Sequence, residues 1–134
     1  MSLPAATFAA PMSYESSDRL QDNIASIKDC LKENKADKEK CTGITKAFCH
    51  LDQPICNRQE ADAWDTLAIR KRPALKKSQA AFKRSVTNRC KYSGKASGYA
   101  GIQQPEPWEP DLAPSGCELQ QSVHRYLRMS RNAL

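Results

Sequence analysis

Six cysteines and two histidines are the side chains in this sequence that could bind a metal or carry out redox chemistry. A structural zinc site needs four ligands, usually in close pairs such as C-x2-C. The chain contains no C-x2-C, and six residues separate Cys49 from Cys56. The same absence excludes the C-x-x-C motif of thiol–disulfide oxidoreductases. We therefore expect neither a metal nor any other cofactor.

Disulfide bonds account for the cysteines better, because cysteines at this density are unusual in a reduced cytosolic protein. In each pair, one cysteine lies near the end of a predicted helix and the other near the start of the next. The three pairs that we predict are Cys30 with Cys41, Cys49 with Cys56, and Cys90 with Cys117. By the chain-entropy model, the last bond would contribute roughly 3–4 kcal/mol, less any strain. Six cysteines also allow other pairings.

Catalytic motifs are missing from the sequence. There is no H-E-x-x-H, no G-x-S-x-G and no phosphate-binding glycine motif. Oxidised cysteines offer no thiol nucleophile, and we interpret His50 and His124 as surface residues rather than as acid–base catalysts. The sequence thus predicts that the protein is not an enzyme.

The apolar residues recur with helical periodicity along the chain. Helices are predicted over about 16–34, 37–51, 54–72, 74–91 and 115–127, and a long loop rich in Pro and Gly over 92–115. The predicted fold is all-α: a small disulfide-stapled bundle of four to five helices. Residues 1–15 are expected to be a flexible N-terminal segment, and 16–134 a single helical domain.

Turn and capping residues mark the expected helix ends. Asp37 is a predicted cap, Pro54 suits a first helical position, and Pro73 should end the third helix. Ser115 and Glu118 match an S-x-x-E capping box. The residues expected to face the core are Leu20, Ile24, Ile27 and Leu31; Cys41, Ile44, Phe48 and Leu51; Ile55, Gln59, Ala63, Trp64 and Leu67; Leu75, Gln79, Phe82 and Val86; and Leu119, Val123, Tyr126 and Leu127.

Positive charge is concentrated in one part of the chain. The formal net charge is +6, and no Asp or Glu occurs from Thr66 to Pro105. The predicted basic surface consists of Arg70, Lys71, Lys76, Lys77, Lys83 and Arg84. Such a surface could bind an anionic envelope polymer or a lipid head group, or it could simply be a solvated helix face.

One loop segment, QPEPWEPDL, combines prolines with acidic residues and a tryptophan. Prolines restrict its conformations, so less entropy would be lost on binding. The residues predicted to contact a target are Glu106, Trp108, Glu109 and Asp111. The alternative is a surface loop whose Trp108 folds back on the helices.

The compartment follows from the cysteines. Stable disulfides require an oxidising environment, yet the N-terminus lacks the features of a secretory signal. We expect that a signal peptide has been removed and that residues 1–3 are a cloning remnant. No apolar run is long enough for a transmembrane helix. The predicted location is the periplasm or the extracellular medium, where no nucleic acid is expected as a partner.

Four segments carry a resemblance to a known family: DCLKENKADKEKCTGI, FCHLDQPICNRQEADAWDTL, LKKSQAAFKRSVTNRCKY and GCELQQSVHRYLRM. They resemble the LprI-like lysozyme-inhibitor domain, a cysteine-bearing helical domain of bacterial envelope proteins. The resemblance runs from Cys30 to Leu127. The chain departs from the family pattern where Phe82 replaces a tryptophan and where Ser85, Val86 and Thr87 replace Tyr-Arg-Asp.

The resemblance implies a protein of the bacterial envelope, and inhibition of lysozyme for at least part of the family. We therefore expect a non-catalytic periplasmic or secreted binding protein with a protein partner, an inhibitor of lysozyme-type hydrolases being the leading case. One alternative is a basic protein that binds an anionic envelope component. A second alternative is an immunity-type protein against another secreted toxin.

Overall fold

The computed structural model describes residues 17–92 and 113–132, and every regular element within these ranges is helical. The longer helices are α2 (Ser17–Glu33), α3 (Gln53–Lys71), α4 (Gln79–Cys90) and α5 (Pro114–Asn132). Short 3₁₀ helices stand between them: η2 (Lys38–Cys41), η3 (Ile44–Phe48) and η4 (Pro73–Ser78). The prediction of a small all-α bundle with disulfides is confirmed.

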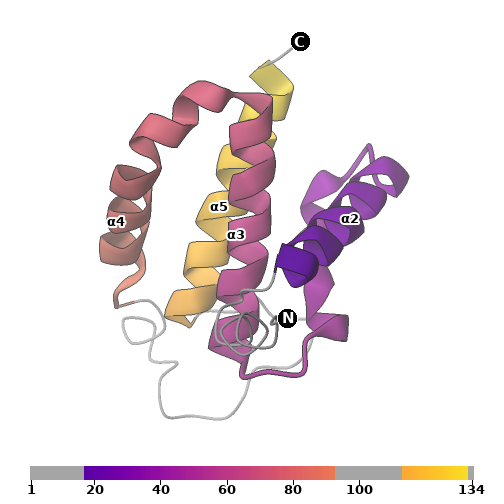
Figure 1. The fold of residues 1–134 in the computed structure, drawn as a ribbon, viewed down its shortest axis with the longest axis horizontal. Coiled ribbons are helices and arrows are strands. Elements are labelled where there is room, and N and C mark those ends of the chain that lie inside the picture. The colour runs from indigo at the N-terminus through magenta and orange to yellow at the C-terminus, as the bar shows by residue number, and fades with distance from the viewer. Residues whose placement is uncertain (1–16, 93–112, 133–134) are drawn as a thin grey trace, which may run out of the picture.

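Helices α3 and α5 lie side by side at the centre of the bundle and run in the same direction (Figure 1). Near their N-terminal ends, Asn57 Nδ2 donates a hydrogen bond to Ser115 Oγ over 3.0 Å. Toward their C-terminal ends, Lys71 Nζ lies 5.9 Å from the centre of the Tyr126 ring. Helix α4 runs back along α5, while α2 packs obliquely against α3.

The hydrophobic core forms where α2, α3 and α5 meet. Trp64 of α3 is fully buried and forms a T-shaped ring pair with Tyr126, with the ring centroids 5.6 Å apart. Ile27 of α2 and Val123 of α5 are also fully buried. The predicted core residues of 16–34 and 115–127 are thus confirmed as the faces that pack inward.

The single helix predicted over about 37–51 is wrong. Two 3₁₀ helices, η2 and η3, take its place, with Gly43 between them at φ 83°. A positive φ of this size favours glycine, because other residues would place Cβ against their own backbone. The helical register is lost at this point, so Phe48 and Leu51 do not reach the core and are 62 % and 47 % exposed.

Other helix boundaries also differ from prediction. The segment after Pro73 begins as the 3₁₀ helix η4 before it becomes α4. The capping box does not describe the start of α5, which begins one residue earlier, at Pro114. Ser115 and Glu118 instead bind α3: Ser115 accepts the bond from Asn57, and Glu118 forms an ion pair with Arg58 over 2.9 Å.

The Glu60 carboxylate fastens the η2–η3 segment to α3. Its Oε1 accepts hydrogen bonds from Thr45 N (3.0 Å) and Thr45 Oγ1 (2.7 Å). Its Oε2 accepts hydrogen bonds from Gly43 N (2.7 Å) and from Trp64 Nε1 (2.9 Å). Glu60 is 1 % exposed, so its carboxylate relies on these four donors in place of water.

The Asp65 carboxylate connects α3 to α4 and α5. Its Oδ1 lies 3.2 Å from Arg125 Nη2 of α5, and its Oδ2 accepts a hydrogen bond from Gln79 Nε2 of α4 over 3.0 Å. Lys83 Nζ is 3.3 Å from the same Oδ2. The Arg125 guanidinium also lies over the Phe82 ring at 3.7 Å. Burial lowers the pKa of the Arg125 guanidinium, and Asp65 opposes that shift.

All three predicted disulfide pairs are confirmed. The Cα atoms are 5.8 Å apart in Cys30–Cys41, 5.9 Å in Cys49–Cys56 and 5.6 Å in Cys90–Cys117, close to the usual spacing. No cysteine is left as a free thiol. The first bond ties the end of η2 to α2, the second ties the residue after η3 to α3, and the third connects the end of α4 to the start of α5.

Replacing Glu60 with Gln should destabilise the fold by about 2–4 kcal/mol, because an amide nitrogen would face two of the four donors. The measurement is urea unfolding at neutral pH under non-reducing conditions. Glu39→Gln is the matched control, since Glu39 is exposed and the same charge is removed. Equal unfolding midpoints for the two variants would show that Glu60 does not anchor the segment.

Alkylation should find no reactive thiol in the unreduced chain, even in denaturant, because all six cysteines are paired. After reduction, the intact mass should rise by six alkyl groups. Peptide mapping without reduction should recover Cys30 linked to Cys41. Any other partner for Cys30 would contradict the pairing.

Candidate functional site

Three large apolar side chains within eight residues of the chain are exposed where η3 passes into α3. Phe48 is 62 % exposed, Leu51 47 % and Ile55 45 %. We call these three residues the apolar corner. Soluble domains rarely expose several large apolar side chains in one place unless the patch serves in binding. The sequence predicted all three as core residues, and that prediction is wrong.

Local structure holds the apolar corner in place. Phe48 ends η3, and the Cys49–Cys56 disulfide ties the residue that follows it to the first turns of α3. Within α3, Cys56 N donates a hydrogen bond to Asp52 O over 3.0 Å. Thr45, at the other end of η3, is held by Glu60. The backbone of the corner is therefore anchored on both sides.

The Cys49–Cys56 disulfide lines two hollows beside this corner. The larger, of about 300 Å³, is lined by side chains from α2, η3 and α3: Arg19, Asp22, Asn23, Thr45, Phe48, Cys49, Cys56 and Gln59. The smaller, of about 160 Å³, is lined by Lys46, Cys49, Leu51, Gln53 and Cys56. Together, the hollows and the apolar side chains offer an uneven surface into which side chains of another protein could pack.

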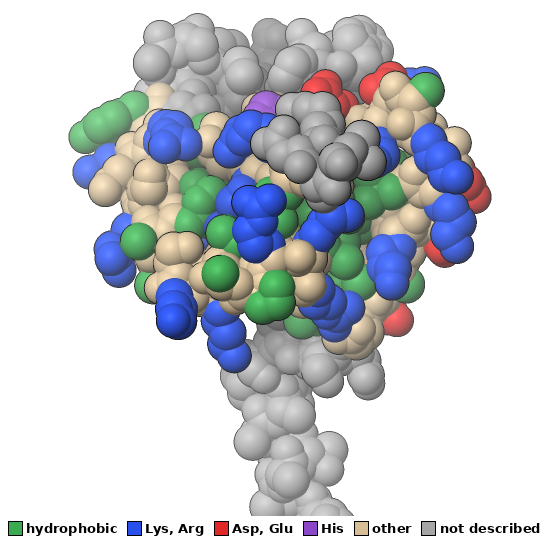
Figure 2. Space-filling view, turned by 90° about the horizontal axis from the view of Figure 1, so that it is seen from above, with side chains coloured by type: hydrophobic (Ala, Val, Ile, Leu, Met, Phe, Trp, Pro, Cys, Tyr) green, Lys and Arg blue, Asp and Glu red, His purple; other side chains and the backbone are tan. Residues whose placement is uncertain are grey.

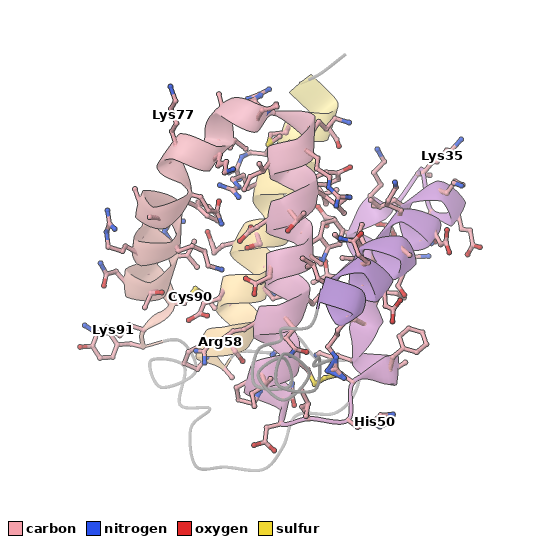
Figure 3. All side chains as sticks on the ribbon, viewed as in Figure 1. Lys35, His50, Arg58, Lys77, Cys90 and Lys91 are labelled. Carbon is pink, nitrogen blue, oxygen red and sulfur yellow. A yellow bond between two sulfur atoms is a disulfide. The ribbon has the colours of Figure 1, made fainter. Side chains whose placement is uncertain are left out.

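The charges around the apolar corner are mixed. Arg19 Nη1 donates a hydrogen bond to Gln59 Oε1 over 3.2 Å across the larger hollow, whose lining also contains Asp22. His50 lies on the turn between η3 and α3 and points outward (Figure 3). The corner thus carries no strong charge of one sign.

The predicted basic residues lie away from this corner, on α3, η4 and α4. Arg70, Lys71, Lys76, Lys77 and Arg84 are exposed. Lys83 differs, since its Nζ lies 3.5 Å from Asp62 and 3.3 Å from Asp65. Figure 2, which views the end of the bundle where α3 passes into η4, shows Lys and Arg spread over this face with few carboxylates.

The other predicted site residues do not form a binding site within the described part of the chain. Glu106, Trp108, Glu109 and Asp111 lie outside the described residues. His50 and His124 are both exposed. Among the side chains of residues 17–92 and 113–132, no group of three His, Cys, Asp or Glu is placed to hold a metal ion. A search of the same residues finds no helix with the length and apolar character needed to cross a bilayer.

Sequence reasoning missed the buried polar groups that build this architecture. Glu60 and Trp64 are one helical turn apart on α3, a spacing that places both side chains on one face. That spacing was a usable signal, but nothing local pointed to Thr45 as the other partner. Asp65 and Arg125 are 60 residues apart, so no local pattern joins them.

Comparisons of the chain with protein-family models, with curated proteins and with solved structures give no match. The resemblance to LprI-like inhibitors therefore stays a prediction from the cysteine and aromatic positions quoted above.

Proposed function

We propose that the chain is a non-catalytic, exported binding protein that recognises a protein partner through the apolar corner. The observation that carries this proposal is the joint exposure of Phe48, Leu51 and Ile55 beside the Cys49–Cys56 disulfide. Interfaces derive most of their binding energy from a few large apolar or aromatic side chains. An exposed phenylalanine on an anchored turn is suited to that role.

Rigidity supports the proposal. A binding surface that is already ordered loses less conformational entropy when the complex forms. The disulfide on one side and the Glu60–Thr45 hydrogen bonds on the other restrain the turn that carries Phe48. The two hollows beside the disulfide provide space for side chains of the partner.

The compartment supports an extracytoplasmic partner. Three disulfides with no free thiol are typical of proteins from oxidising environments such as the periplasm or the extracellular medium. The resemblance to LprI-like domains makes a lysozyme-type hydrolase the first partner to test. In that case Trp108 and the acidic residues around it would form a second contact, with the cleft of the enzyme.

The double substitution Phe48→Ser, Leu51→Ser should weaken binding to a lysozyme-type hydrolase at least 100-fold, because it removes two buried anchors of the interface. Calorimetric titration and turnover of cell-wall substrate are the measurements. Tyr92→Ser is the control, since Tyr92 is 63 % exposed but lies two residues after the end of α4. The control should bind like the unmodified chain.

Two results would count against the proposal in different ways. If turnover is unchanged at tens of micromolar protein, lysozyme-type hydrolases are not the partner. If the enzyme is inhibited and the double variant inhibits equally well, the apolar corner is not the binding surface. Loss of inhibition in Trp108→Ala, Glu109→Ala would then assign binding to the loop.

A further inference from the structure

A second surface, on η4 and α4, carries cations where the apolar corner carries apolar side chains. Lys77, Arg84 and Lys91 are spaced seven residues apart, which is close to two helical turns. Arg84 and Lys91 lie at this spacing along α4 and its C-cap, so their side chains lie on nearly the same side of that helix, about 20° apart. Lys77 comes before α4, in the 3₁₀ helix η4, and continues the row of cations past the N-terminal end of α4. All three are exposed, and we call them the cationic strip. Lys91 points sideways, away from α3 and α5, and Lys77 points outward beyond the end of the bundle (Figure 3).

The cationic strip contains no negative charge. The side chains exposed between its cations are small or neutral: Ala80, Ala81, Thr87 and Asn88. No ion pair joins Lys77, Arg84 or Lys91 to a carboxylate among the side chains that the structure describes. Their charges are therefore available to an external anion.

Lys83 shows that only the outer side of α4 has cations that can bind an external anion. It immediately precedes Arg84, yet it turns toward α3 and pairs with Asp62 and Asp65. Burial raises the pKa of the Asp62 carboxyl, and Lys83 opposes this shift by favouring the charged form. The fold thus neutralises the inner lysine of α4 and leaves the outer cations unneutralised.

The length of the strip indicates what kind of anion it suits. Successive cations are about 10 Å apart along the axis, and the strip is about 20 Å long. At physiological salt, electrostatic interactions are screened over about 8 Å. A small anion would therefore feel one cation at a time, whereas an extended chain of anionic groups could contact all three.

We propose that the cationic strip binds a linear polyanion, which lies along η4 and α4 and contacts Lys77, Arg84 and Lys91 in turn. An anionic bilayer fits less well. A helix that binds in a membrane interface buries its apolar face there, but α4 has packed Val86 and Cys90 inward. Tyr92 is exposed beside Lys91, whose Nζ lies 5.6 Å from the centre of the Tyr92 ring, but a single aromatic side chain at one end of the strip does not form an apolar face.

Fluorescence anisotropy with labelled inorganic polyphosphate of about 60 units tests the proposal. Each contact with a flexible chain contributes about −0.7 to the slope of log K against log salt, so three contacts contribute about −2. Binding that depends on the strip should fall about 15-fold between about 50 and 200 mM salt. Tripolyphosphate should bind far more weakly, because it cannot span the strip.

The decisive comparison is between two triple variants with the same net charge. Lys77→Gln, Arg84→Gln, Lys91→Gln should reduce the salt slope by about 2 and weaken binding at least tenfold at low salt. Lys28→Gln, Lys32→Gln, Lys40→Gln removes three exposed cations from α2 and η2. That control should keep most of the affinity.

Several outcomes would overturn the proposal. One is absence of polyphosphate binding by the unmodified chain at low salt, and another is equal loss in the two triple variants. Tripolyphosphate that binds as tightly as the long chain would show a single-anion site instead. Strip-dependent binding to vesicles of phosphatidylglycerol and phosphatidylcholine, without binding to polyphosphate, would assign the surface to membranes.

Discussion

The Glu60 carboxylate is the interaction on which the shape of this protein depends. Residues 38–48 form only short 3₁₀ turns, which have poorer hydrogen-bond geometry than an α-helix and little stability of their own. Glu60 binds two backbone N–H groups and one hydroxyl of that segment, and the Trp64 indole binds the same carboxylate. The largest side chain of the core is thereby joined to the least regular part of the fold.

Two disulfide bonds add to the restraint that the Glu60 carboxylate places on the η2–η3 segment. Cys41 at the end of η2 is bonded to α2, and Cys49 after η3 is bonded to α3. With Glu60 between them, the segment is held at three points along about a dozen residues. A small core of this kind benefits from such restraints, because few large side chains are available to offset the entropy of ordering the chain. The restraint is also what keeps Phe48 on the surface.

The proposed binding surfaces consist of side chains that the internal contacts of the fold do not bury or pair. Asp65 and Asp62 neutralise Lys83 and Arg125 at the junction of α3, α4 and α5. The cations on the outer side of α4 have no comparable partner among the described residues. In the apolar corner, Phe48 and Leu51 are exposed where two 3₁₀ helices around Gly43 replace a continuous α-helix, and Ile55 is exposed in the first turn of α3. Lys77 and Lys91 lie on one side of the bundle, and His50, on the turn between η3 and α3, lies on the other (Figure 3).

The sequence by itself determined the helical class, the approximate bounds of α2, α3 and α5, and the three disulfide pairs. These were accessible because each depends on residues near one another: helical periodicity spans a few turns, and each disulfide joins elements that follow one another along the described chain. The acid-free interval and its positive charge could be read in the same way, by composition alone.

Only the tertiary structure decided which of those residues are exposed and which of their charges are paired. Periodicity placed Phe48 and Leu51 inside, but two 3₁₀ helices joined by a left-handed glycine replace the expected α-helix, and both side chains are exposed. Ile55, in the first turn of α3, was also expected inside and is exposed. Composition treated Lys83 and Arg84 alike, but carboxylates on a neighbouring helix capture the first and leave the second exposed. Local sequence patterns indicate the secondary structure that a residue's neighbours in the chain favour. Burial and charge pairing depend instead on side chains that packing brings from elsewhere, as with Asp65 and Arg125.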